Sequence, residues 1–157
     1  MMANEKSDQQ SIQLSRKQFL ALLKLTYLGN WMANAPRTQN MKEDYESIES
    51  FVFSFAPAFG FEKYMDHEES DGDRYYPTGL FEEETDVHKL HEEYDEETFW
   101  DELADRLGER DFYEKYSKEE IKRMDREERF TKLYECIDAV SDELEKYGLG
   151  RLRIRGE

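Results

Sequence analysis

Three histidines carry most of the potential for chemistry, and all lie in or beside a strongly acidic stretch: His67, His88 and His91. On a helix, Glu84, His88 and Glu92 lie four residues apart and present a carboxylate, an imidazole and a second carboxylate on one face. Zinc and manganese accept such ligands. One interpretation is therefore a metal-dependent enzyme with its site around His88. The simpler interpretation is a solvated His88 beside two glutamates, and we expect no bound metal or cofactor.

Other patterns that would indicate catalysis are missing from the sequence. There is no HExxH motif, and no glutamate stands three residues before any histidine, as it does in di-iron helical bundles. Glycine-rich phosphate loops, zinc-knuckle spacings and nucleophile elbows are also missing. Cys136 has no histidine near it in sequence and lies beside an apolar stripe, which predicts a packed thiol. We therefore expect a protein that is not an enzyme.

The negative charge is concentrated in one third of the chain. The formal net charge is −16, and residues 62–111 hold 20 acidic and 5 basic side chains, which accounts for 15 of those charges. We expect this segment to bind a basic protein surface, for example that of a nucleic-acid-binding protein, because carboxylates can imitate phosphates. Repulsion between like charges disfavours direct binding of nucleic acid. The residues expected to contact the partner are Glu82, Glu83, Glu84, Glu92, Glu93, Asp95, Glu96 and Glu97.

The composition allows two other interpretations of this charge. It can form a solvated face that keeps the protein in solution, or belong to a structural homo-oligomer in which it has no partner. The 10 Phe, 10 Tyr and 2 Trp give a chain of 157 residues enough apolar bulk for one folded core. A single cysteine suits the reducing cytoplasm, where we expect the protein.

The elements that must position these residues are organised around the apolar run Phe19 to Met32. Its apolar side chains fall on nearly every side of a helix, which predicts a central helix covered all round. Ser15 is the expected N-cap, and the helix should end before Pro36. The run is too short for a membrane span and Lys24 interrupts it, so we expect no membrane association. A secretory leader cleaved near residues 33–35 is a less favoured interpretation.

Apolar residues at spacings of three and four predict an amphipathic second helix with Asn40 as its N-cap, and its stripe consists of Met41, Tyr45, Ile48, Val52, Phe55 and Phe59. Residues 51–55 also alternate in polarity, so a strand is an alternative there. Residues 62–85 have poor periodicity and predict a long loop.

Four more helices are expected after this loop. Two short apolar stripes indicate helices over 87–94 and 99–107, with Gly108 closing the second. A capping box at Ser117 predicts a short helix, and the most regular stripe predicts a long one over 125–147. Part of that stripe can also pack against a second copy, which makes a homodimer a further expectation.

Together these patterns predict an all-α, single-domain helical bundle of about six helices, with one long acidic loop and a short C-terminal extended tail. The expected parts are a flexible N-terminal arm over 1–14, a helical domain over 15–148 and a basic tail over 149–157. The expected function is a non-catalytic acidic interaction module whose 62–111 segment docks a basic protein.

Overall fold

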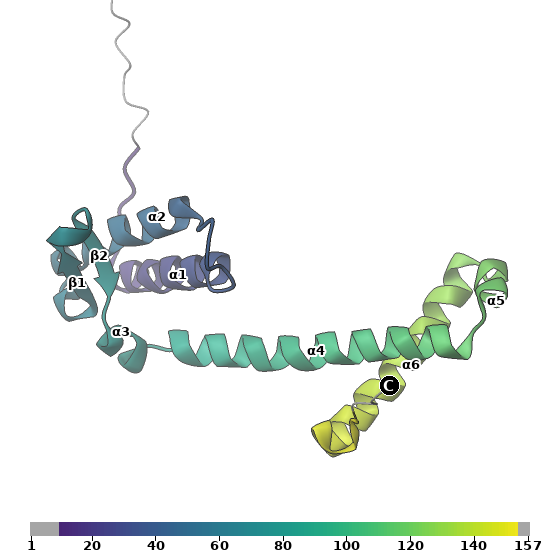
Figure 1. The fold of residues 1–157 in the computed structure, drawn as a ribbon. Helices are drawn as coiled ribbons and strands as arrows, with labels where there is room; N and C mark the ends of the chain where they lie inside the picture. Colours follow the sequence, from purple (N-terminus) through teal and green to yellow (C-terminus); the bar gives the residue numbers. More distant parts are fainter. Residues whose placement is uncertain (1–9, 154–157) are drawn as a thin grey trace, which may run out of the picture. The chain divides into compact units, whose positions relative to one another are not determined.

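The structure is a computed structural model that describes residues 10–153 and contains, within this range, six α-helices and one two-stranded sheet (Figure 1). The predicted all-α fold class is confirmed. Within the same residues we find no helix with the length and apolarity that a membrane crossing requires. The chain divides into two compact units, Met1–His91 and Glu92–Glu157, which we call the N-terminal unit and the C-terminal unit and describe separately.

Helix α1 (Arg16–Asn34) begins at its predicted N-cap. Ser15 Oγ accepts a hydrogen bond from the backbone N–H of Gln18 at 3.3 Å, and Gln18 Oε1 accepts one from the backbone N–H of Ser15 at 2.9 Å. This reciprocal capping box satisfies two amide groups that a helix start otherwise leaves unpaired. The helix ends at Asn34, before Pro36, as predicted.

Helix α2 (Glu43–Phe53) lies beside α1 in Figure 1 and begins after Lys42, so the predicted N-cap at Asn40 is wrong. Asn40 takes a left-handed φ of 56° in the connection. The side chain of Asn34 on α1 instead accepts the backbone N–H of Lys42 at 2.7 Å and so holds the start of α2. Because α2 runs through Phe53, the strand alternative for residues 51–55 is also wrong.

The predicted loop over 62–85 contains several short elements. Strands β1 and β2 pair as an antiparallel hairpin, with Met65 opposite Pro77 and Glu68 opposite Arg74. Gly72 and Asp73 turn the chain between them with φ values of 71° and 62°. The elements of this region are η1 (Ala56–Phe59), η2 (Glu62–Tyr64), β1 (Met65–Glu68), η3 (Glu69–Asp71), β2 (Arg74–Pro77) and α3 (Gly79–Glu84).

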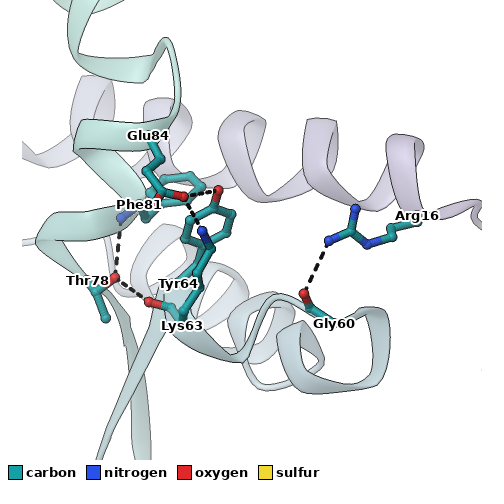
Figure 2. A network of polar contacts seen from close by, with 7 residues as sticks. All are labelled: Arg16, Gly60, Lys63, Tyr64, Thr78, Phe81 and Glu84. Atoms are coloured by element: carbon teal, nitrogen blue, oxygen red, sulfur yellow. Dashed lines mark hydrogen bonds and ion pairs between the residues drawn. The ribbon is translucent and has the colours of Figure 1, made fainter.

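Aromatic rings fill the core of the N-terminal unit. Phe81 on α3 is fully buried, and its ring centre lies 5.5, 5.2 and 5.6 Å from those of Tyr27, Phe53 and Tyr64. Thr78 Oγ1 accepts the Phe81 N–H at 3.3 Å and thereby caps α3 (Figure 2). The buried core residues are Phe19, Leu23, Val52, Phe53, Ala56, Phe61, Tyr64, Phe81 and Val87.

Helix α1 is not covered all round as the sequence predicts. Leu23 is fully buried, but Leu25 is 67% exposed and Met32 is 58% exposed. The apolar stripe predicted for the second helix is buried only in part: Val52 lies in the core, whereas Tyr45 and Ile48 are exposed. The N-terminal unit thus presents apolar side chains to solvent on both of its long helices.

Helix α4 (Val87–Lys115) is continuous where two short helices were predicted, and the division between the units falls inside it. Gly108 does not end a helix. A Cβ atom at Gly108 would lie 2.5 Å from Cα and 2.8 Å from N of Ile137 on α6 (Arg126–Tyr147). Glycine is therefore required here because the two helix backbones approach closely where α4 and α6 cross in Figure 1.

The starts and ends of the last helices follow the sequence signals. Ser117 and Glu120 form the predicted capping box of α5 (Lys118–Arg123), and Asp125 caps α6. Gly148 ends α6 with a positive φ of 52°. The small core of the C-terminal unit, which includes the predicted packed thiol, consists of Ala104, Phe112, Cys136 and Leu144.

The chain ends are only partly described. Residues 10–15 contain no helix or strand, and residues 1–9 of the predicted N-terminal arm lie outside the described residues. In the predicted basic tail, η4 (Gly148–Arg151) is followed by Leu152 and Arg153 without regular structure. Residues 154–157 lie outside the described residues.

Candidate protein-interaction site

Five of the eight predicted interaction residues lie on α4 and belong to one exposed acidic stretch. All six positions from Glu92 to Glu97 are exposed. Residues 92–105, which we call the acidic segment, contain no Lys or Arg. Their acidic side chains are all exposed: Glu92, Glu93, Asp95, Glu96, Glu97, Asp101, Glu102 and Asp105.

Aromatic side chains are interleaved with these carboxylates. Tyr94 and Phe99 are 49% and 48% exposed, and Trp100 is half-buried. The indole N–H of Trp100 donates to Glu96 Oε1 at 2.6 Å, and Phe99 contacts Trp100 edge to face at 5.0 Å. Exposed aromatic side chains next to charged groups are common anchors of protein interfaces. The acidic segment therefore offers both charge and apolar contact area.

A groove between α4 and α6 adjoins the acidic segment within the C-terminal unit. It has a volume of about 470 Å³. Ala104 and Leu144 are buried at its base, and Trp100 lines one side. Two carboxylates, those of Asp101 on α4 and Glu145 on α6, also line it. Its volume lies within the range of known ligand pockets.

The three predicted interaction residues on α3 have other neighbours. Glu82 accepts a hydrogen bond from the Tyr27 hydroxyl at 2.7 Å. Glu84 forms an ion pair with Lys63 and accepts a hydrogen bond from the Tyr64 hydroxyl at 2.9 Å (Figure 2). The hydrogen bonds from Lys63 and Tyr64 lower the pKa of the Glu84 carboxyl. Two of these glutamates thus connect α3 to the rest of its unit, whereas Glu83 is simply exposed.

The structure does not support a metal site around His88. Helix α3 ends at Glu84 and α4 begins at Val87, so Glu84 and His88 are not one turn apart on a single helix. The Glu84 carboxylate is directed at Lys63 and Tyr64 instead (Figure 2). Among residues 10–153, no group of three His, Cys, Asp or Glu side chains has an arrangement that could hold a metal ion.

Sequence reasoning missed a buried carboxyl group between α1 and α2. Glu49 is only 8% exposed, and Asn30 Nδ2 donates to its Oε2 at 2.7 Å. Burial raises the pKa of the Glu49 carboxyl to about 7, and the nearby Glu46 carboxylate makes a smaller contribution in the same direction. The hydrogen bond from Asn30 lowers this pKa but is outweighed by burial. The position of Glu49, four residues before the buried Phe53 on the same helix face, is the signal that could have revealed it.

Comparison of the chain with protein families, curated proteins and solved structures finds no match. The functional conclusion therefore rests on the chain's own residues. The charge, exposure and aromatic content of the acidic segment are the features that most clearly suggest binding.

Proposed function

We propose that this protein is a non-catalytic binding module whose acidic segment binds a polypeptide rich in lysine and arginine. The observation that carries this proposal is the set of eight exposed carboxylates on residues 92–105 without an intervening basic side chain. Repulsion among these charges is relieved when a basic partner approaches. Tyr94 and Phe99, both about half exposed, supply apolar contact area between the charges.

The chemistry of the segment favours a basic polypeptide over the alternatives. Nucleic acid carries the same sign of charge and would be repelled. A metal enzyme would need converging ligands, and residues 10–153 present no such group. We place the module in the cytoplasm, because its single cysteine, Cys136, is buried as a packed thiol and the chain contains no second cysteine to pair with it.

A titration with a defined probe tests the proposal. The probe is a lysine- and arginine-rich peptide with leucines at helical spacing, and its binding is measured by calorimetry at several salt concentrations. We expect the affinity to fall steeply as salt rises, because the charges of the segment are exposed and screened. Replacement of Glu92, Glu93, Glu96 and Glu97 by glutamine should weaken binding by about tenfold or more.

A matched variant separates the acidic segment from the general charge of the chain. Glu114, Glu135, Asp138 and Asp142 are also exposed but lie outside the segment. Their replacement by the corresponding amides removes the same formal charge and should change the affinity much less. Equal losses in the two variants would contradict the proposal and would leave only a general effect of net charge.

A second candidate, a homo-oligomer, is favoured by the exposed apolar face of α1. Leu25 and Met32 lie on this face, and neither is covered. Large exposed apolar groups often mark contacts between chains. Sedimentation at rising protein concentration tests this candidate, with Leu25→Glu as a variant that should abolish association without disturbing the core. A protein that remains monomeric at all concentrations would exclude it.

A further inference from the structure

The groove between α4 and α6 has features that together suit one kind of side chain. It is a hollow of about 470 Å³ whose base is formed by the buried side chains of Ala104 and Leu144. None of the residues that line it is Lys or Arg. A ligand group that enters the groove would therefore meet apolar atoms at the base and carboxylates at the edge.

The indole ring of Trp100 gives the groove an aromatic wall. Its N–H donates to Glu96 Oε1 at 2.6 Å, one turn earlier on α4, so the polar atom of the indole is already satisfied. This hydrogen bond restrains the orientation of the ring and occupies the N–H donor, so a ligand in the groove would meet the ring mainly through its π system. A cation over a tryptophan face is attracted by the ring quadrupole, and arginine also stacks on it through its planar guanidinium.

Two carboxylates line the groove together with Trp100, namely Asp101 on α4 and Glu145 on α6. Both are exposed, and neither forms a hydrogen bond or an ion pair with another described residue. The groove also reaches Gly148 at the C-terminal end of α6, where the helix dipole is negative. All three features favour a positive charge.

The same chain shows this kind of recognition elsewhere in the C-terminal unit. The Arg151 guanidinium lies 3.3 Å from the centre of the Tyr147 ring and pairs with the Glu143 carboxylate at 2.7 Å. An aromatic face and a glutamate thus hold an arginine of the chain itself. The groove provides the same two partners, in Trp100 and Glu145, and adds a second carboxylate.

From this geometry we infer that the α4–α6 groove receives an arginine side chain of the basic polypeptide bound by the acidic segment. The guanidinium stacks on Trp100 and is paired with Asp101 and Glu145, and its methylene stem lies against Ala104 and Leu144. Arginine fits this arrangement better than lysine, because a planar guanidinium can stack and pair with carboxylates in the same pose. This inference rests on the proposed function and specifies which partner residue is selected.

The test compares two peptides that have the same length, charge and leucine spacing, one with arginine and the other with lysine at every basic position. Binding is followed by tryptophan emission in a Trp31→Phe protein, in which Trp100 is the remaining tryptophan. We expect the arginine peptide to change this emission and to bind about tenfold more tightly than the lysine peptide.

Variants of the groove determine whether this preference arises there. The pair Asp101→Asn and Glu145→Gln should remove the preference for arginine. A control pair, Glu109→Gln and Asp138→Asn, changes one exposed carboxylate on each of the same helices outside the groove and should preserve it. Circular dichroism confirms that each variant keeps its helices.

The outcomes separate this inference from the function on which it rests. If both peptides bind equally, or if the groove pair leaves the arginine preference unchanged, the inference is overturned while the acidic binding module stands. If neither peptide binds, both conclusions are overturned. The inference is supported if the groove pair loses the preference for arginine and the control pair keeps it.

Discussion

In the N-terminal unit, the rings of Phe53 and Tyr64 both contact the ring of Phe81, and all three are buried from solvent. The C-terminal unit has a much smaller core, and α4 and α6 approach each other closely at Gly108 and Ile137. Several of its aromatic side chains remain exposed, namely Tyr94, Phe99, Tyr113, Phe130 and Tyr134. One unit thus uses most of its rings for its own stability, and the other leaves many of them available for binding.

This contrast shows that aromatic content alone does not reveal what a region does. The N-terminal unit also has Leu25 and Met32 in solvent, but no dense charge surrounds them on α1. In the acidic segment the exposed rings of Tyr94 and Phe99 lie among carboxylates, and that combination favours a basic amphipathic partner over a second copy of an acidic chain. Each unit contains one tryptophan, Trp31 or Trp100, so each can be followed separately.

The largest expected effect comes from Phe81→Ala in the N-terminal unit. This ring is fully buried among three others, and its removal should cost about 3–5 kcal/mol of the free energy of unfolding. Urea unfolding followed by Trp31, in a Trp100→Phe background, should show the loss. The transition followed by Trp100, in a separate Trp31→Phe background, should not move, and an equal shift of both transitions would show that the two units unfold as one.

Glu49→Gln should give the N-terminal unit a different dependence on pH. The folded unit holds the Glu49 proton up to about pH 7, whereas an ordinary carboxyl releases it near 4.5. The unit therefore loses stability as pH rises from about 4.5 to about 7. Glutamine remains neutral and should stabilise the unit at pH 8 by up to about 3 kcal/mol. Urea midpoints from pH 4 to 8 measure this, and a parallel profile for both proteins would argue against a buried neutral carboxyl.

Gly108→Ala should destabilise the C-terminal unit by about 2 kcal/mol. Alanine favours helix formation by about 1 kcal/mol relative to glycine, but its methyl group would collide with backbone atoms of Ile137. The transition followed by Trp100 in a Trp31→Phe background reports the change. The same substitution at Gly29 on α1, where a Cβ would meet nothing within 4 Å, should not destabilise the N-terminal unit. Stabilisation at both glycines would mean that the helices do not approach as closely as described.

The smallest expected effect is about 1 kcal/mol, from Ser117→Ala at the start of α5. The substitution removes one half of the capping box with Glu120. It should shift only the unfolding of the C-terminal unit. Ser141→Ala is the matched control, because Ser141 lies exposed within α6 and its replacement should be neutral or slightly stabilising. Equal midpoints for the two variants would show that the cap contributes nothing measurable.

Features controlled by neighbours in sequence could be predicted. Ser15, Ser117 and Asp125 cap their helices because each side chain reaches an amide three residues ahead, and Gly148 ends α6 because it takes a positive φ. The exposure of the five acidic side chains within 92–97 also follows from their own charge. These signals require no knowledge of the rest of the fold.

Features controlled by distant residues could not be predicted in the same way. Gly108 suggested a helix end, but it permits contact with Ile137, which lies far away in sequence. The hairpin was missed because β1 carries Asp66, His67 and Glu68 instead of an alternating apolar pattern. The groove was also missed, because its two carboxylates come from α4 and α6 and are distant from each other in sequence.

The lack of lysine and arginine between Lys89 and Arg106 also determines how this region reacts with proteases and chemical cross-linkers. Trypsin cleaves after lysine and arginine, so digestion releases residues 90–106 as one acidic peptide. Cross-linkers directed at amines find no lysine within it. A carbodiimide, in contrast, activates carboxylates for direct coupling to an amine, so it would join a lysine of a bound polypeptide to this stretch without a spacer. The bound partner could then be identified from the mass of a single tryptic adduct.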